Sequence, residues 1–277
     1  PRQSSAGRFW EAQLGRRRLL FPVEPTADGV LPHDGTYDGE KLHRRPWMDP
    51  NRTIVIAGCD PAVGLLASEL WRNAGMRLIP LIRSSREALA LVERGVVHAA
   101  GVHWSDDGDT DANAAMVSER LGPGFRMLHM ARWQEGLALS GTRRSHDSVS
   151  ALVRSRIRWV VREEGSGARR CLDRLLSGVA VRPRFRHLAR DHRGVAQAIR
   201  SGWAEAGVTV RLAAEDAGLQ FISVQEEDYE LCYAEGLRRD AALIALRKVL
   251  RSTVAKKLFS DLPGYAVERM GEERAVG

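Results

Sequence analysis

The fold of this chain is decided by residues 160–173, which read VVREEGSGARRCLD. An apolar run ends in a Gly-Ser-Gly turn, and leucines at helical spacing follow at once. Glycine lets a backbone turn sharply, and the first amides of the new helix have no partner within it. Because the positive end of the helix dipole lies behind those amides, such a junction suits an anion. The stretch predicts a strand, a ligand-facing turn and a helix.

The same alternation of strands and helices recurs on both sides of this stretch. On the N-terminal side, strands are expected at 53–57, 78–82 and 96–102, with helices at 60–75 and 84–94. On the C-terminal side, helices are expected at 192–202 and 212–217, followed by a long amphipathic helix at 239–258. Strands separated by helices of this length favour right-handed βαβ units and parallel sheets.

The remaining pattern predicts a second sheet. Further strands are expected at 125–130, 136–139, 158–161, 185–188, 208–210, 221–224 and 231–233, with helices at 148–153 and 168–176. Two successive α/β sheets, with late strands returning to the first, predict an α/β body of two lobes around a cleft. Residues 1–50 mix Gly, Pro, Asp and Arg, so we expect a linker or N-terminal arm there rather than a core element.

Composition is that of a globular protein, with 44% apolar and 28% charged residues among 277. No apolar run reaches the ~20 residues of a membrane span, and no signal-peptide pattern is present, so we expect a cytoplasmic protein without a membrane partner. The chain opens with proline, which leads us to expect further residues upstream. Cys59, Cys171 and Cys232 are odd in number and lack metal-ligand spacing. They predict isolated buried thiols and no metal site.

Positive charge is concentrated in one part of the chain. Residues 151–200 hold thirteen arginines against four acidic residues, an excess larger than the net charge of +7 for the whole chain. Such a segment fits an anionic ligand or a nucleic acid. A solvated arginine face is the alternative, because only four of the 42 basic residues are lysine and arginine is therefore common throughout.

Several segments together resemble a known family. They read AGCDPA at 57–62, AAGVH at 99–103, GSGAR at 165–169, HRGVAQAIRSGWAEAG at 192–207, FI at 221–222, YEL at 229–231 and LPGY at 262–265. In this order and spacing they look like the substrate-binding domain of cytoplasmic bacterial regulators, which is similar to type 2 periplasmic binding proteins. Relatives of that domain are also fused to molybdopterin-biosynthesis proteins. The resemblance covers roughly residues 53–271.

The resemblance implies an α/β, two-lobed type 2 periplasmic-binding-protein-like fold with an interlobe cleft and crossover hinge strands. Lobe I would hold residues 51–130 and 213–277, and lobe II residues 131–212. It also implies a sensory domain that closes on a small ligand, with molybdate, tungstate or a related anionic metabolite as the candidate. DNA would be bound through an upstream helix-turn-helix module absent from this chain, and a homodimer is the candidate assembly.

Ligands in α/β proteins bind beyond the carboxyl ends of strands, which selects the loops 58–62, 101–105 and 165–169. Adding the matches to the family's segments gives the full set of candidate ligand-binding residues: Cys59, Asp60, Pro61, His103, Trp104, Gly165, Ser166, Gly167, Ala168, Arg169, His192, Arg193 and Tyr229.

Each candidate also has a structural interpretation. Asp60 and Pro61 fit an N-cap and a first helical residue, and His103 fits a satisfied loop histidine. Arg169 fits an ion pair with Glu163 or Glu164 as well as with an anion. Turn geometry alone accounts for the glycines around Ser166. Asp191, where the family has threonine before His192, fits a further N-cap, and Tyr229 either closes the cleft or packs at the hinge.

No catalytic constellation is visible, so we expect a binding domain rather than an enzyme. The acidic stretch at 106–111 resembles a calcium loop but has Val117 at the twelfth position, where glutamate belongs, and is interpreted as a solvated loop. Cys171, on a first helical turn beside arginines, predicts a lowered thiol pKa. It would be the adduct site in one alternative, a cofactor-pathway enzyme on the same fold. The other alternative is direct nucleic-acid binding by the arginine-rich lobe.

Overall fold

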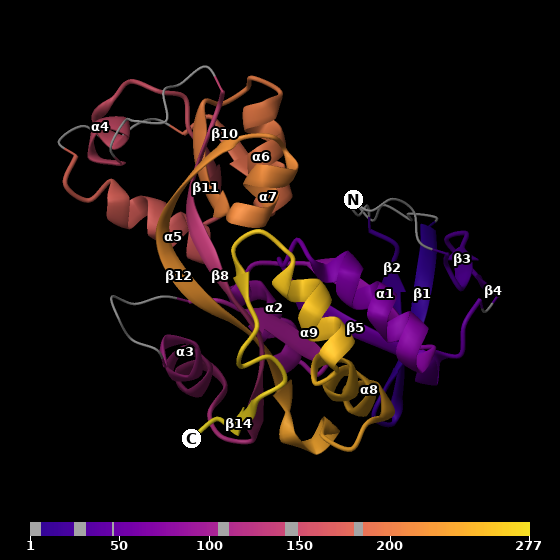
Figure 1. The fold of residues 1–277 in the computed structure, drawn as a ribbon. Helices are drawn as coiled ribbons and strands as arrows, with labels where there is room; N and C mark the ends of the chain where they lie inside the picture. The colour runs from indigo at the N-terminus through magenta and orange to yellow at the C-terminus, as the bar shows by residue number, and fades with distance from the viewer. Residues whose placement is uncertain (1–6, 25–31, 46, 105–110, 142–148, 180–184) are drawn as a thin grey trace.

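The computed structural model describes residues 7–24, 32–45, 47–104, 111–141, 149–179 and 185–277. These form two α/β lobes joined by two long strands that run from one lobe into the other (Figure 1). The two-lobed fold of the sequence analysis is confirmed. The acidic stretch at 106–110 lies outside the described residues, as do Ser105 and Ser148. No helix among the described residues is long and apolar enough to span a bilayer.

Lobe I is built on a sheet whose central strands are parallel. Strand β5 (Thr53–Gly58) lies between β6 (Arg77–Ile82) and β7 (Ala99–Val102), and its six residues are all buried. The helices of this part are α1 (Val63–Ala74), α2 (Ser85–Glu93) and α3 (Ala112–Leu121). Because parallel strands end at the same edge, the loops after β5 and β7 meet above the sheet, facing lobe II.

The two lobes share strands β8 (Phe125–Leu139) and β12 (Gln220–Ala234), which pair antiparallel along their whole length. The sequence predicted two short strands in place of each. Its apolar runs break at polar residues such as Glu135 and Glu227, which the structure buries where the strands cross between the lobes. Register shifts interrupt the ladder between Ser223 and Gln225 and between Tyr229 and Glu230. These two irregularities make the ribbon the natural hinge.

Lobe II covers the far ends of the hinge strands. Strand β11 (Ala206–Val210) pairs with β8, and β9 (Val160–Arg162) pairs in parallel with β10 (His187–Ala189). The helices are α4 (Val149–Arg154), α5 (Gly167–Leu175), α6 (His192–Arg200) and α7 (Arg211–Asp216). Trp159 is buried at the centre of this lobe's apolar cluster.

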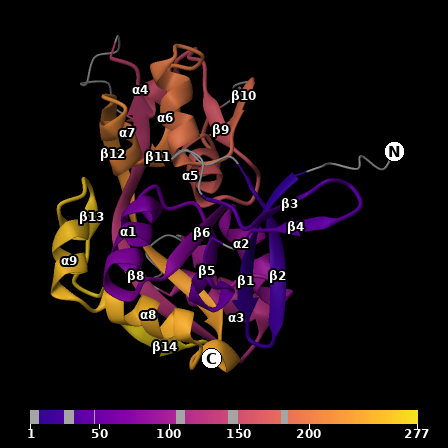
Figure 2. The same ribbon diagram turned by 90° about the vertical axis from the view of Figure 1, so that its right-hand side faces the viewer.

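The N-terminal residues differ from the expected linker. They form an antiparallel sheet in the order β2-β1-β3-β4, from β1 (Gly7–Leu14), β2 (Arg17–Pro22), β3 (Gly35–Tyr37) and β4 (Leu42–Arg44). Trp10 on β1 is fully buried against Val55 and Ile79 of lobe I. Glu11 beside it obscured the apolar pattern, but its carboxylate is paired with Arg44 at 2.7 Å. This sheet therefore extends the core of lobe I (Figure 2).

One buried ion pair fastens this sheet to the parallel sheet of lobe I. The guanidinium of Arg77 on β6 donates to both carboxylate oxygens of Asp34, at 2.6 and 3.0 Å. Asp34 also accepts the backbone amides of Glu11 and Trp47. Both charged side chains are almost fully buried. The bidentate geometry and the added amides compensate for the loss of hydration.

The C-terminal part returns to lobe I and contains two helices where one was expected. Helix α8 (Ala241–Leu250) ends before Ser252, whose side chain accepts the amide of Ala255 and caps α9 (Thr253–Ser260). The break leaves Val254 exposed instead of on the apolar stripe. Strands β13 (Tyr265–Ala266) and β14 (Glu273–Ala275) add to β8, and the 3₁₀ turns are η1 (Pro50–Arg52) and η2 (Glu235–Leu237).

Candidate functional site at the lobe interface

Side chains from both lobes and from the hinge meet at one buried point. Cys59 and Asp60 follow β5, and His103 follows β7, all in lobe I. His192 opens α6 in lobe II, and Tyr229 lies on β12. Each is at most 5% exposed. The space that the sequence assigned to a cleft is therefore packed with side chains here.

The chain of contacts in the centre runs from a thiol through an imidazole to a carboxylate. The sulfur of Cys59 lies 3.2 Å from Nε2 of His103, and Nδ1 of the same ring lies 2.8 Å from Oε2 of Glu227. Burial by itself would lower the pKa of His103, but the Cys59 sulfur and the Glu227 carboxylate raise it well above its usual range. His103 is thus a fully buried histidine held from both sides.

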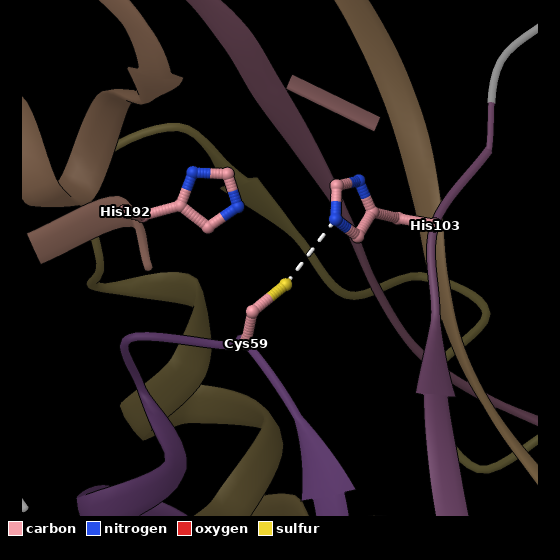
Figure 3. Close-up of side chains that lie close together, drawn as sticks. All are labelled: Cys59, His103 and His192. Carbon is pink, nitrogen blue, oxygen red and sulfur yellow. Dashed lines mark hydrogen bonds between the residues drawn. The ribbon is translucent and has the colours of Figure 1, made fainter. Parts of the chain in front are cut away.

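His192 completes this group from lobe II. Asp191 caps α6 by accepting the amide of Gly194 at 2.6 Å, which fixes the helix start that carries His192. The His192 ring points toward His103 and Cys59 (Figure 3). Its Nδ1 lies 3.4 Å from the hydroxyl of Thr209, whereas its buried Nε2 has no hydrogen-bond partner among the described residues. Burial, with help from Arg162 and His103, lowers the pKa of His192 and keeps the ring neutral.

Tyr229 fills the amide-lined turn at the end of β5. The backbone amides of Cys59 and Asp60 are hydrogen-bonded to its phenol oxygen. Gly58 and Gly101 flank that oxygen, and a Cβ atom at either position would collide with it. The ring stacks on Trp133 with centroids 4.6 Å apart. The amides that the sequence assigned to an anion are thus occupied by the protein itself.

Asp60 and its neighbour Pro61 also have internal partners. The Asp60 carboxylate accepts the amide of Ala62 at 2.8 Å and the hydroxyl of Tyr265 at 2.6 Å, and burial raises its pKa. Helix α1 begins at Val63, later than the sequence predicted, with the Asp60 side chain bonding to its start. The carbonyl of Pro61 accepts Arg193 at 2.9 Å, a direct bond between the lobes.

Two buried carboxylates lie on the hinge strands, one on each. The amide of Gln225 donates to Glu135 at 2.9 Å and to Glu227 at 2.6 Å, so it bridges them. Burial, and then the nearby Glu227, raises the pKa of Glu135 well above its usual range. Burial, and then the nearby Glu135 carboxylate, raises the pKa of the Cys171 thiol, contrary to the lowering that its helical position predicted.

An open groove begins where this buried cluster ends. It has a volume of about 320 Å³ and runs between Arg86 and Trp104 of lobe I and the start of α5 in lobe II. Ser166 caps α5 by accepting the amide of Arg169 at 3.2 Å, and Gly165 takes the turn at φ +87°. The guanidinium of Arg170 lies 4.5 Å from the centre of the Trp104 ring.

The groove is basic on balance, although it also contains carboxylates. Arg169 is paired with Asp173 at 3.0 Å and approaches Glu164 rather than Glu163, which is bound by the buried Arg162. No carboxylate in the described part of the chain pairs with Arg86. The lining holds Arg86 of lobe I and Arg169 and Arg170 of lobe II against Glu164 and Asp173, so arginines from both lobes outnumber the carboxylates by one.

The structure divides the predicted residues between these two places. The buried cluster receives Cys59, Asp60, Pro61, His103, His192 and Tyr229, and the groove receives Trp104, Gly165, Ser166 and Arg169. Arg193 lies partly exposed at the edge of the cluster, where it donates to the Pro61 carbonyl. Gly167 and Ala168, at the start of α5, lie buried between the two. Sequence reasoning missed Glu135, Glu227 and Trp133 on the hinge and Arg86 on α2. Only burial at the crossing point identifies the first three, because nothing in their local sequence does.

The comparisons with known proteins identify the family. Residues 67–251, more than half of the chain, match the PBP superfamily domain. This chain is a PBP superfamily domain. A curated relative, the uncharacterized protein YvgK of Bacillus subtilis (strain 168), is 26% identical to this PBP domain over 230 residues, which is 81% of the chain and 74% of that protein.

Solved structures show the same fold at low sequence identity. A putative phosphate ABC transporter substrate-binding protein with bound phosphate, from Clostridium perfringens, has a TM-score of 0.58 at 12% identity and covers 75% of this chain and 96% of its own. The regulatory domain of CcmR from Synechocystis PCC6803, in complex with 2-PG, has a TM-score of 0.54 at 13% identity, covering 73% and 98%. A reduced form of OxyR from N. meningitidis has a TM-score of 0.53 at 15% identity and covers 77% of this chain and 98% of its own.

Proposed function

We propose that this PBP domain is the sensory domain of a cytoplasmic bacterial transcriptional regulator and binds a small anion in the groove between Arg86 and Arg170. The observation that carries the proposal is the origin of these two arginines, because one belongs to lobe I and the other to lobe II. An anion held by both would bridge the lobes. DNA binding through an upstream helix-turn-helix module and assembly as a homodimer belong to the same proposal.

The rest of the groove supports an anionic guest. Its volume of about 320 Å³ suits an inorganic oxyanion or a small organic acid. The start of α5, the positive end of a helix dipole, lines the groove through Gly165 and Ser166, and the Ser166 hydroxyl itself donates to the Glu163 carbonyl at 2.9 Å. Trp104 adds a flat apolar wall beside Arg170. Molybdate and tungstate are the oxyanions to test first, and phosphate and small carboxylates follow.

Closure of the lobes is the proposed signal. A ligand that contacts both arginines binds the closed arrangement more tightly than an open one, and this difference in affinity shifts the population toward the closed form. Arg193 already links the lobes through Pro61, and His103 packs on Gly167. The ligand would therefore add to an interface that the protein partly supplies itself.

The test is titration of the purified chain with molybdate, tungstate, phosphate and dicarboxylates, followed by calorimetry and thermal unfolding. Charge-assisted hydrogen bonds contribute about 1.5–3 kcal/mol, so Arg86→Gln and Arg170→Gln should each weaken binding about 10- to 100-fold. Arg239→Gln, an exposed arginine near the start of α8, is the matched control and should bind as the parent does. Thermal shifts caused only by neutral or cationic compounds would overturn the proposal.

One observation favours a second candidate function, an enzyme with a cysteine nucleophile. The Cys59–His103–Glu227 contacts have the order of a nucleophile, a base and an orienting carboxylate. Any covalent chemistry would then use Cys59, not the Cys171 that the sequence indicated. Mass spectrometry after incubation with electrophilic metabolite analogues tests this. An adduct on Cys59 that disappears in His103→Gln would favour the enzyme.

Direct nucleic-acid binding receives less support from the arginines of lobe II. Several are engaged within the protein: Arg162 with Glu163, Arg169 with Asp173, and Arg193 with Asp216. A binding track would need these charges free on one face. Steeply salt-dependent DNA binding by this chain alone would revive the alternative.

A further inference from the structure

Three ligand-type side chains converge at the buried centre of the lobe interface. The sulfur of Cys59 and one ring nitrogen each of His103 and His192 all lie within 4.8 Å of one another, and all three residues are buried. Two come from loops of lobe I and the third from the first residue of α6 in lobe II. We propose that these three residues bind one thiophilic divalent metal ion of the Zn²⁺ class, which links the two lobes.

The strongest support is the unpartnered nitrogen of His192. Its ring is fully buried, and Nε2 has no hydrogen bond within the described residues. A buried polar atom without a partner costs about 1–3 kcal/mol, so a folded protein rarely leaves one in place without a use for it. This nitrogen points toward the Cys59 sulfur and the His103 ring (Figure 3). A metal ion in that space would give it a partner.

The two histidines are also oriented as metal ligands commonly are. Glu227 lies 2.8 Å from Nδ1 of His103, which directs Nε2 of that ring at Cys59. The Thr209 hydroxyl donates to the carbonyl of His192 and lies 3.4 Å from its Nδ1, which again leaves Nε2 for the metal. A carboxylate or hydroxyl behind each imidazole fixes the tautomer and the ring angle. Gly167 packs against His103 and holds that ring in place.

The distances suit a first-row metal after a small adjustment of the three side chains. A tetrahedral Zn²⁺ ion places its nitrogen ligands roughly 3.3 Å apart and sulfur roughly 3.6 Å from nitrogen. The Cys59–His103 separation of 3.2 Å is already close to this, and the widest separation in the group is at most 4.8 Å. One thiolate with two imidazoles favours Zn²⁺, Co²⁺ or copper over Mg²⁺ and Ca²⁺, which prefer oxygen.

A second possible group shares His103 but is less well supported. Glu135 and Glu227 also lie within reach of that ring, which would make a site rich in oxygen ligands. In that group, however, both carboxylates already accept the Gln225 amide and Glu227 also lies against Nδ1 of His103, so only Oε1 of Glu135 is without a partner among the described residues. The unpartnered His192 nitrogen would stay unused. The Cys59, His103 and His192 set is therefore the one we assign.

Three protein ligands leave one position of a tetrahedron open, for water or for a donor atom of the small ligand. Because the ligands come from both lobes, metal binding would favour the closed arrangement, as the proposed anion would. The metal inference uses the same two-lobed closure as the proposed function but none of its groove residues. Either the metal site or the anion-binding groove can therefore be disproved without affecting the other.

The test titrates metal-free, tag-free protein with Co²⁺ and then displaces it with Zn²⁺. The expected result is one Co²⁺ per chain, with a sulfur-to-cobalt charge-transfer band and the intense visible bands of four-coordinate cobalt. Cys59→Ser should lose the charge-transfer band and bind metal more than about 100-fold more weakly. Loss of a residue that only hydrogen-bonds to a metal ligand already lowers metal affinity about 10- to 100-fold. Cys171→Ser, which removes another buried thiol outside the cluster, is the matched control. It should keep the charge-transfer band and the metal affinity of the parent protein.

A variant of the lobe II ligand tests the link between the lobes. His192→Asn keeps a polar side chain and should still give a thiolate band, but with weaker binding and no metal-induced rise in the unfolding temperature. Zn²⁺ should also protect Cys59 of the parent protein from alkylation. Six-coordinate cobalt spectra, or equal binding by Cys59→Ser and the parent, would overturn the metal site. Anion titrations of the metal-free protein report separately on the proposed function.

Discussion

Gly167, the first residue of α5, packs directly against the imidazole ring of His103. A Cβ atom at position 167 would come within 2.6 Å of ring atoms Cε1 and Nδ1 and 3.1 Å of the His103 carbonyl oxygen. No real Cβ contact is that short, so only glycine allows lobe II to approach lobe I this closely. The close contact between the two lobes thus depends in part on the absence of a side chain at Gly167.

Gly167→Ala should separate the lobes or distort the His103 ring. Overpacking of this kind costs about 1–3 kcal/mol, whereas alanine in an unstrained helix would be favourable. We expect a lower unfolding temperature and a larger radius of gyration by small-angle X-ray scattering. Gly178→Ala, at an exposed position with no atom within 4 Å of the added carbon, should change neither. An unchanged radius and stability in Gly167→Ala would contradict the packing described.

Asp34→Asn should destabilise the protein strongly because it leaves Arg77 charged and buried. Breaking a buried ion pair costs about 3–5 kcal/mol, measured by urea unfolding. Asp261→Asn removes an exposed pair with Lys257 and should cost at most about 1 kcal/mol. Comparable losses in the two variants would show that the Asp34 pair is not the anchor of the N-terminal sheet.

The same pair predicts how stability depends on pH. Burial would raise the pKa of Asp34, but the bonds from Arg77 and from the Glu11 and Trp47 amides lower it overall. A carboxyl whose pKa is depressed by folding stabilises the protein above its unfolded pKa, about 3.9, and loses that contribution as pH falls through the folded value. The gap in unfolding free energy between parent and Asp34→Asn should be constant above about pH 5 and narrow below about pH 4. A gap that widens on acidification would refute this.

Tyr229→Phe should leave the amides of Cys59 and Asp60 without their acceptor. An unsatisfied buried donor costs about 1–3 kcal/mol, so we expect a loss of that order in unfolding free energy. Tyr37→Phe removes the hydroxyl of a partly exposed tyrosine, which donates to the Gly39 carbonyl, and should be nearly neutral. If phosphate or molybdate stabilises Tyr229→Phe but not the parent, the phenol occupies a site able to bind oxyanions. Equal stability of the parent and Tyr229→Phe would mean that those amides have other partners.

Cys171 and Cys232 should resist alkylation in the folded protein. Burial raises the pKa of Cys232 to about 12 and moves the pKa of Cys171 in the same direction, so little thiolate exists at neutral pH. Mass spectrometry after iodoacetamide treatment should show modification of both only with denaturant present. Rapid labelling of either thiol without denaturant would show that its burial is transient.

Local chemistry explains which features the sequence could predict. The junction at Gly165–Ser166 depends on a positive φ and an N-cap, and both are properties of neighbouring residues. The same holds for Asp191, which caps α6 as expected. The burial of the three free thiols was also predicted correctly, since burial of single cysteines follows from composition. Each of these inferences needed only a few adjacent residues.

Features that depend on contacts distant in sequence could not be predicted in this way. The hinge strands were divided because Glu135 and Glu227 look solvent-exposed until each is placed beside its distant partners. Trp10 gave no core signal because its burial depends on β5 and β6, more than forty residues away. Cys59 and His192 are 133 residues apart, and no spacing rule links them. Arg86 lines the groove only because the fold brings α2 close to the start of α5.

The two register shifts in the β8–β12 ribbon fall on either side of Glu227, after Ser223 and after Tyr229. A ribbon flexes where its ladder is irregular, so any rotation of one lobe against the other is concentrated in the segment that carries this carboxylate. Glu227 in turn holds the ring of His103. A rotation of the lobes would therefore reach the imidazole of His103 through its contact with Glu227.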